Sequence, residues 1–427
     1  MNRLLGASEQ TLSLLAQTKP INVVLCATIT GAITTKQLNA ALAWVQQRHP
    51  LLKVKVVDEN SEHPRFVSEG VASIPLQVIE RQGEGHWCLE VQEELSRPFS
   101  RTDDPLVRVM CLQSPSISEL IVSFDHCIGD GLSGVYLLRD ILYYLSELDI
   151  NYLPQQRELP SCEELIPSKD TTDQLIGTRY PINQENSTIF EQKLSISQNS
   201  IDEKQNHLIY WYFLPEETAK LISYCRKEEI SVHSILCASY LLAIANEMKL
   251  ADDAILIKCM SPINLRNYLL PQVGEDFGTY YTREVTYHQI RDTSNLCNVA
   301  RDVKRQLKQV MVSDKIFNHL LEVKAFLSTK PDALKLRQYL KGLIGSDLTV
   351  TNLGRLDFPV QFGSLHLQQL YITVAGIAPI IVGAVTLGGK MFVTCRNLEM
   401  IVPQAYAQRI NQQAIQLLRE AVITYHS

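Results

Sequence analysis

The stretch that decides the fold is ISELIVSFDHCIGDG, residues 117–131. Ile117 to Phe124 is rich in apolar residues and predicts a largely buried strand. Leu132 to Leu148 carries apolar residues at helical spacing and predicts an amphipathic helix. The loop between them holds His126 and Asp130 in the spacing His-x-x-x-Asp-Gly. A strand, a short loop and a helix in this order indicate a mixed α/β fold.

The size and charge of the chain limit the classes of protein to consider. The 427 residues are 45% hydrophobic and exceed the usual size of a single core, so we expect two or three domains. Charged residues make up 20% of the chain, and the formal net charge is −6. The charges form no block of one sign, so a nucleic-acid partner is not expected.

The ten cysteines are scattered and form no C-x-x-C pair. We therefore expect neither a disulfide framework nor a metal site, and a cytoplasmic location fits this cysteine usage. The N-terminus lacks the apolar stretch of a signal peptide. Because no window reaches about 18 uninterrupted apolar residues, no membrane span is predicted.

The chain divides into an N-terminal lobe (1–150), a crossover linker (151–206) that is rich in proline and polar residues, and a C-terminal lobe (207–427). Predicted strands of the first lobe are 22–30, 51–57, 106–112 and 117–124, with a helix that Thr34 or Thr35 caps. Predicted elements of the second lobe are strands at 207–214, 254–260, 365–374, 380–387 and 391–394, a hairpin at Gly388-Gly389, a helix from Ser231 to Met248 and a final helix after Pro403.

His126 is the first candidate for chemistry. A neutral imidazole has one nitrogen that accepts a proton and one that donates a hydrogen bond, and it titrates near neutral pH. At a strand end it predicts a general base that deprotonates a nucleophile. The alternative is a buried histidine satisfied by backbone groups. Gly131 permits a sharp bend or a close approach of the substrate to the backbone.

Asp130 has three possible roles. It can hydrogen-bond His126 as the acid of a catalytic triad does, or it can cap the helix that follows. It can also turn away and pair with a buried arginine. Arg266 in MSPINLRNYL is the candidate partner, because an arginine in apolar company needs a carboxylate. The alternative for Arg266 is a solvated loop residue.

Asp125 is adjacent to His126, and strand alternation places it on the opposite side, so we interpret it as structural. A metal site at Asp125, His126 and Asp130 is disfavoured, since no second histidine cluster lies nearby.

The segment LTVTNLGRLDF, residues 348–358, is the third candidate region. Thr351 and Asn352 at a strand end can donate hydrogen bonds to a developing oxyanion, whereas Asn352 with Gly354 is also typical of an ordinary turn. The segment 274–282, GEDFGTYYT, combines a glycine turn with a polar and aromatic strand. We assign Thr351, Asn352, Gly354 and Thr279 to the substrate channel.

Five segments in this order resemble the chloramphenicol acetyltransferase-like superfamily. They are Ser8–Thr11 (SEQT), Arg48–Leu52 (RHPLL), His126–Gly131, Pro262–Arg266 (PINLR) and Thr351–Arg355 (TNLGR). The superfamily includes condensation domains of nonribosomal peptide synthesis, plant alcohol acyltransferases and polyketide-associated (phthiocerol dimycocerosyl) acyltransferases. The chain is most similar to the last group, over nearly its whole length.

The resemblance implies two chloramphenicol acetyltransferase-like lobes, each a mixed β-sheet with flanking helices, and an active-site tunnel between them. An acyl thioester on coenzyme A or on a carrier protein's phosphopantetheine is then the co-substrate, an alcohol or amine is the acceptor, and no cofactor is permanently bound. It also implies that His126 takes the acceptor's proton, that Asp130 pairs with Arg266, and that Asn352 lines the channel.

Two departures from the family pattern matter. Many condensation domains carry two adjacent histidines, and Asp125 replaces the first of them here. The plant signature D-F-G-W-G is matched only in part, by Asp276–Gly278, so coenzyme A binding of the plant type is not supported.

Three functions follow as hypotheses. The first is an ester-forming acyltransferase of lipid, polyketide or other secondary metabolism. The second is an amide-forming condensation enzyme that acts on a carrier-bound chain, and the third is a non-catalytic module that docks carrier proteins. We expect a monomer, because two lobes of one chain complete the site.

Overall fold

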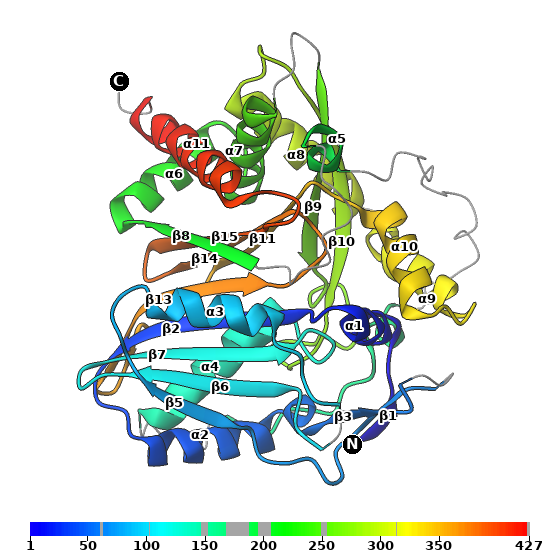
Figure 1. The fold of residues 1–427 in the computed structure, drawn as a ribbon, viewed down its shortest axis with the longest axis vertical. Helices are drawn as coiled ribbons and strands as arrows, with labels where there is room; N and C mark the ends of the chain where they lie inside the picture. The colour runs from blue at the N-terminus through cyan, green and yellow to red at the C-terminus, as the bar shows by residue number, and fades with distance from the viewer. Residues whose placement is uncertain are drawn as a thin grey trace.

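The computed structural model describes residues 1–59, 63–101, 103–146, 153–167, 188–194, 206–248, 254–312 and 314–424. Two six-stranded sheets lie one above the other, each with helices packed on it (Figure 1). The fold is therefore mixed α/β with two lobes, as the sequence predicts.

The sheet of the first lobe has the strand order β12-β13-β2-β7-β6-β5. β2 pairs antiparallel with β7 along its whole length, with Asn22 opposite Asp125. Both strands are apolar and almost completely buried, which explains why this pair forms the centre of the sheet. The bounds are β2 Asn22–Thr30, β5 Leu76–Glu80, β6 Val107–Gln113, β7 Ile117–Asp125, β12 Gln361–Phe362 and β13 Leu365–Val374.

Four helices and a small sheet complete the first lobe. Thr34 begins α2 as its cap, since the side-chain oxygen accepts from the amide of Gln37. The helices are α1 Ala7–Thr18, α2 Thr35–Arg48, α3 His86–Ser96 and α4 Gly131–Leu145. The small sheet has the order β1-β4-β3, with β1 Asn2–Leu4, β3 Lys55–Val57 and β4 Arg65–Val67.

The sheet of the second lobe has the order β10-β9-β11-β14-β15-β8. Its strands are β8 Asn206–Phe213, β9 Ile255–Asn264, β10 Tyr281–Ile290, β11 Leu348–Arg355, β14 Ile380–Leu387 and β15 Lys390–Leu398. Its helices are α6 Pro215–Lys227, α7 Val232–Glu247, α8 Leu296–Met311, α9 Asn318–Leu327, α10 Ala333–Ile344 and α11 Gln404–Thr424. Helix α7 is buried on nearly all sides, which fits its apolar sequence.

Strand β13 connects the two sheets. It comes from the segment assigned to the C-terminal lobe (207–427), yet it pairs with β2 of the first lobe. It also touches the second sheet, because Thr394 Oγ1 of β15 donates to the carbonyl of Ile372 at 2.6 Å. Any side chain at Gly383 would clash with that carbonyl. Strands from 361–374, within the segment predicted as the C-terminal lobe, thus complete the first sheet.

Most predicted elements appear close to their expected bounds, including the hairpin at Gly388-Gly389. The predicted strand 51–57 is wrong in its first half, because Pro50–Lys53 forms a 3₁₀ turn (η1) and only Lys55–Val57 is a strand. Of the predicted linker, the structure describes 153–167 and 188–194, with a 3₁₀ turn Cys162–Glu164 (η3) and a short helix Ile189–Lys193 (α5). The remainder of the linker lies outside the described residues.

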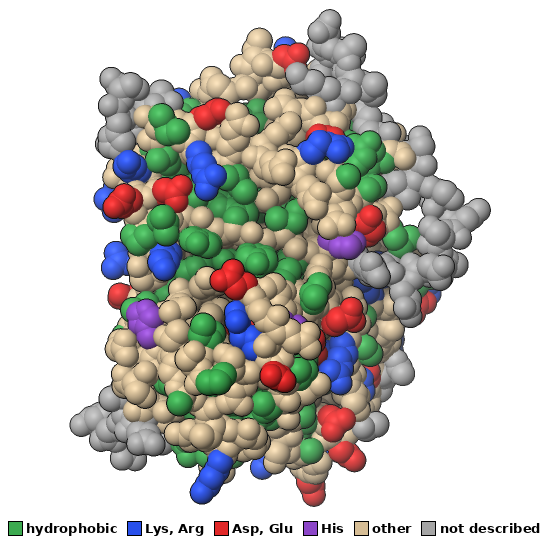
Figure 2. All heavy atoms as spheres, turned by 60° about the vertical axis from the view of Figure 1, so that its left-hand side comes forward, with side chains coloured by type: hydrophobic (Ala, Val, Ile, Leu, Met, Phe, Trp, Pro, Cys, Tyr) green, Lys and Arg blue, Asp and Glu red, His purple; other side chains and the backbone are tan. Residues whose placement is uncertain are grey.

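Hydrophobic side chains gather at mid-height on one face of the molecule, level with the junction of the lobes (Figure 2). Tyr210 and Tyr212 of β8 are exposed, and so is Leu214, which directly follows the strand. Within the described ranges, no single helix is long and apolar enough to cross a membrane, although α6 and α7 satisfy those criteria together with a 96° bend between them.

A buried carboxylate, Asp140, joins α2 to α4. Its oxygens accept from Arg48 Nε at 2.7 Å and from Arg139 Nη2 at 2.9 Å, and His49 Nε2 lies 3.0 Å away. Arg48 and His49 belong to the RHPLL segment, so this segment links the end of α2 to α4 through Asp140. Burial alone would raise the pKa of Asp140, but its hydrogen bonds to His49 and the arginines lower it to about 2.

We predict that Asp140→Asn lowers the free energy of unfolding by about 3–5 kcal/mol, because it leaves the buried guanidinium of Arg48 without its carboxylate and removes one of the two carboxylates of Arg139. Asp103→Asn, which removes an exposed partner of Lys55, should change it by less than about 1 kcal/mol. Because the folded pKa of Asp140 is depressed, its contribution is complete above pH 3.8 and is lost as the pH falls toward 2. Urea unfolding of both variants would test this, and equal losses would contradict it.

Candidate active site

The His126 loop connects the central strand of the first lobe to a helix. β7 ends at Asp125 and α4 begins at Gly131. The backbone amide of His126 donates to the carbonyl of Ile21 at 2.9 Å, which fixes the start of the loop on β2's side. Asp130 caps α4, because its Oδ1 accepts from the amide of Ser133 at 2.9 Å.

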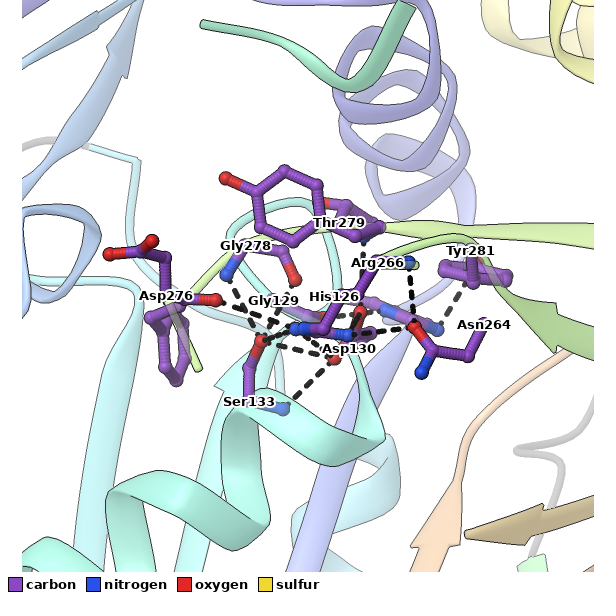
Figure 3. Close-up of polar contacts among 12 residues, drawn as sticks. His126, Gly129, Asp130, Ser133, Asn264, Arg266, Asp276, Gly278, Thr279 and Tyr281 are labelled. Carbon is purple, nitrogen blue, oxygen red and sulfur yellow. Dashed lines mark hydrogen bonds and ion pairs between the residues drawn. The ribbon is translucent and has the colours of Figure 1, made fainter. Parts of the chain in front are cut away.

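Asp130 also forms the ion pair that the sequence predicts. Its two oxygens accept from Arg266, Oδ2 from Nη1 at 2.7 Å and Oδ1 from Nη2 at 3.0 Å. Figure 3 shows the Arg266 side chain extended toward the loop from just beyond β9. Both side chains are buried, so this two-pronged contact joins the lobes in a place that water reaches poorly.

Ser133 and the backbone of residues 278–280 form further hydrogen bonds around this ion pair. Ser133 Oγ lies 2.9 Å from Arg266 Nη2 and donates to the carbonyl of Gly278. The amide of Tyr280 donates to Asp130 Oδ2 at 3.1 Å. Burial alone would raise the pKa of Asp130, but the Arg266 guanidinium and the two amides hold it below its usual value. Sequence reasoning missed Ser133, which stands in the first turn of α4.

His126 makes its hydrogen bonds to groups other than Asp130, so the triad role considered for Asp130 is not the one observed. Nδ1 lies 2.8 Å from the carbonyl of Gly129. A carbonyl only accepts, so Nδ1 carries the hydrogen and Nε2 of the neutral ring is unprotonated. Burial, together with the Arg283 guanidinium, lowers the pKa of His126. The imidazole is therefore neutral at neutral pH.

Two residues of β10 that sequence reasoning missed lie against His126. Tyr281 stacks on the imidazole, with ring centroids 5.3 Å apart, and its hydroxyl lies 3.3 Å from Nε2 (Figure 3). Arg283 Nη2 donates to the Tyr281 hydroxyl. Residues at i and i+2 of a strand share a face, and this alternation in TYYTREV is the pattern that would have revealed the pair.

A cavity of about 230 Å³ opens beside His126, between the lobes. Its apolar wall comes from α1, β2, α10 and the β13–β14 connection, and includes Leu12, Leu15, Ile21, Val23, Leu340, Ile344, Ile372 and Val374. Its polar lining residues include His126, Asn264, Tyr281, Arg283, Thr349, Thr351 and Asn352. A neutral histidine thus lines a largely apolar cavity.

The four residues assigned to the substrate channel separate into two pairs. Thr351 and Asn352 line the cavity, and Asn352 Oδ1 accepts from the amide of Gly354 at 2.9 Å, which builds the turn that the alternative interpretation predicted. Gly354 and Thr279 do not line it, and this expectation is corrected. Gly354 forms the turn with φ of 75°, and buried Thr279 donates to the carbonyl of Cys127 at 3.1 Å.

Asp125 and Gly131 have supporting positions. Asp125 Oδ2 accepts from Arg101 Nη2 at 2.6 Å and Oδ1 from the amide of Cys127 at 2.9 Å, and the residue is buried away from the cavity. Gly131 lines the cavity, and a Cβ there would lie 3.0 Å from Ile372 and 3.1 Å from Leu353. A side chain at position 131 would therefore narrow the chamber beside the base.

One protein-family model and one curated protein match parts of this chain. The family described as phthiocerol/phthiodiolone dimycocerosyl transferase C-terminus matches residues 208–379. Bacitracin synthase 1 from Bacillus licheniformis is 28% identical over 133 residues, which are 29% of this chain and 2% of that much longer protein.

Solved structures match the whole chain at low identity. A trichothecene 15-O-acetyltransferase from Fusarium sporotrichioides has a TM-score of 0.71 at 10% identity, covering 98% of this chain and 95% of that one. Polyketide synthase associated protein 5 from Mycobacterium tuberculosis has a TM-score of 0.66 at 15% identity, covering 98% of both chains. The first condensation domain of the CDA synthetase has a TM-score of 0.67 at 14% identity, covering 99% of this chain and 96% of that one.

We predict that Asp130→Ala lowers the free energy of unfolding by about 3–5 kcal/mol, because it leaves the buried Arg266 without its partner. Asp332→Ala is the matched control, since Asp332 caps α10 in the same way but is exposed and lacks a buried guanidinium. The control should lose much less stability in thermal or urea unfolding. An Asp130→Ala protein as stable as the parent would show that the pair does not support the site.

Proposed function

Because the chain has the chloramphenicol acetyltransferase-like fold of condensation enzymes and acyltransferases, we propose that it transfers an acyl group from a thioester to an alcohol. His126 acts as the general base. The observation that carries this proposal is the position of His126, which lines the cavity with Nδ1 2.8 Å from the carbonyl of Gly129 and Nε2 3.3 Å from the Tyr281 hydroxyl. Because Nδ1 donates to that carbonyl, Nε2 of the neutral ring is available to accept a proton.

In the proposed reaction, the acceptor hydroxyl takes the place next to Nε2 that the Tyr281 hydroxyl occupies. Its oxygen attacks the thioester carbonyl carbon as its proton passes to Nε2. The tetrahedral intermediate then collapses, the carbon–sulfur bond breaks, and the thiolate leaves with the proton returned by the imidazolium. The products are an ester and a thiol, and His126 is neutral again.

The other cavity residues have supporting roles in this proposal. The apolar wall from α1, β2 and α10 accommodates a hydrocarbon acyl chain, since burial of apolar surface favours its binding. Asn352 offers its amide nitrogen to the oxyanion, because its Oδ1 is occupied by the amide of Gly354. Asp130 and Arg266 act by holding the His126 loop rather than by touching substrate.

The donor in this proposal is a thioester of coenzyme A or of a carrier protein's phosphopantetheine, and the reaction belongs to cytoplasmic lipid, polyketide or other secondary metabolism. We propose a monomeric enzyme, since both lobes of one chain supply the residues around His126. An amine acceptor, which would give an amide, and a non-catalytic docking role are the alternatives that the experiments below separate.

We predict that His126→Ala lowers the rate of acyl transfer by about 10²–10⁴-fold, because the acceptor keeps its proton. The assay supplies acyl-coenzyme A or an acyl carrier protein with alcohol and amine acceptors in parallel. His366→Ala, which removes a histidine outside the cavity, should retain full activity.

Unfolding curves that match the parent would show that His126→Ala is folded. Full transfer by that variant would refute the proposed base. Transfer to amines alone would favour the condensation alternative, and carrier binding without transfer by the parent chain would favour the docking module.

We further predict that the rate depends on pH through His126. Only the neutral imidazole accepts a proton, so the rate rises with pH through the pKa of His126 and falls on acidification. Because burial and Arg283 lower that pKa, the midpoint of the pH–rate profile should lie below 6.5, and Arg283→Gln should raise it. A midpoint above 6.5 in the parent protein would contradict this assignment.

A further inference from the structure

The charges that line the cavity do not balance. His126, Asp130, Arg266 and Arg283 are its ionisable residues apart from Tyr281. Asp130 and Arg266 neutralise one another through two hydrogen bonds, and His126 is neutral. Arg283 is left as a positive charge without a carboxylate partner among the described residues.

Arg283 is also near two carboxylates, since Glu284 and Glu322 line a second, smaller pocket on its far side, but no ion pair of Arg283 is found among the described residues. Its side chain lines this pocket, and so does His319 of α9. Burial and the nearby guanidinium lower the pKa of His319 to about 3, so that imidazole is neutral. The contact that the structure gives Arg283 inside the cavity is the hydrogen bond to the Tyr281 hydroxyl.

A half-buried guanidinium that faces an apolar chamber is unfavourable unless an anion compensates it. Its planar array of donors fits a carboxylate or a phosphate with two parallel hydrogen bonds. The chain supplies such a carboxylate to Arg266, from Asp130, and to Arg139, from Asp140 and Glu275. Arg283 has no such partner among the described residues, and it also lacks the backbone carbonyls of Ala378 and Gly376 to which buried Arg396, another arginine without a carboxylate there, donates.

We propose that Arg283 determines substrate specificity by binding a carboxylate that a substrate carries close to its reacting group. The inference rests on the proposed function, since it names the class of substrate for that same site.

The position of Arg283 limits where the anion stands in the substrate. One hydroxyl, that of Tyr281, separates Arg283 from His126 Nε2. A hydroxyl bound at Nε2 and a carboxylate bound at Arg283 are thus separated by a few bonds, as in a small hydroxy acid. The phosphate of a phosphopantetheine donor is excluded, because the length of the pantetheine chain separates it from the thioester.

The carboxylate can belong to the acceptor or to the acyl group, and matched probes distinguish the two sources. The acceptor arm compares 3-hydroxyoctanoate with its methyl ester. The acyl arm compares malonyl-pantetheine with butyryl-pantetheine. Binding is measured by titration calorimetry and transfer by product formation, for the parent chain and for Arg283→Gln, Arg283→Lys and Arg291→Gln.

Arg291→Gln is the charge-matched control, because Arg291 is exposed just beyond β10 and outside the cavity. One of the two probe pairs represents the substrate that carries the natural carboxylate. For that pair, the parent chain and the Arg291→Gln control should bind the carboxylate probe about tenfold to a hundredfold more tightly than the neutral probe, the range expected for hydrogen bonds to a charged group. Arg283→Gln should lose the preference and Arg283→Lys should keep part of it. Unfolding curves show which variants are folded.

Equal binding of charged and neutral probes in both arms by the parent chain would overturn the inference, and so would a preference that persists in folded Arg283→Gln. If no probe is acylated while the carboxylate still binds through Arg283, the proposed transfer fails and the anion site stands. If transfer occurs without any preference for the carboxylate, the proposed function stands and the anion site fails.

Discussion

The ion pair between Asp130 and Arg266 is the interaction on which the site depends. It links the loop at the end of β7 in the first lobe to the segment beyond β9 in the second, with two hydrogen bonds in a buried setting. The same carboxylate caps α4 through Ser133. A single side chain thus fixes a loop, starts a helix and joins two lobes, and the cavity exists because the lobes meet at this distance.

This arrangement gives the acidic residue a different task from that in a serine protease triad. In a triad the carboxylate hydrogen-bonds the imidazole and sets its tautomer. Here the carbonyl of Gly129 does so, and the carboxylate of Asp130 is used entirely by Arg266, Ser133 and a backbone amide. Because Arg266 neutralises the charge of Asp130, this carboxylate does little to stabilise an imidazolium at His126. Burial and the Arg283 guanidinium lower the pKa of His126.

The sequence predicts the parts of the site that depend on local patterns. The strand to Asp125, the helix from Gly131 and the cap at Asp130 are short-range features, and Arg266 was found because a lone arginine in apolar company requires a carboxylate. The pairing of β13 with β2 was not predicted, since it joins residues more than 300 positions apart. Tyr281 and Arg283 were missed for the same reason: what they contact depends on how the second sheet packs on the first.

The structure also gives Asp125, the residue before His126, a physical role. Successive residues at a strand end face opposite sides, and the structure places Asp125 away from the cavity, in an ion pair with Arg101 and a hydrogen bond to the amide of Cys127. The amide contact helps to turn the chain immediately after His126. A residue at this position thus shapes the loop from behind while the reacting groups meet on the other side. Asp125 consequently supports the loop, and the imidazole at position 126 stays free to act as the proposed base.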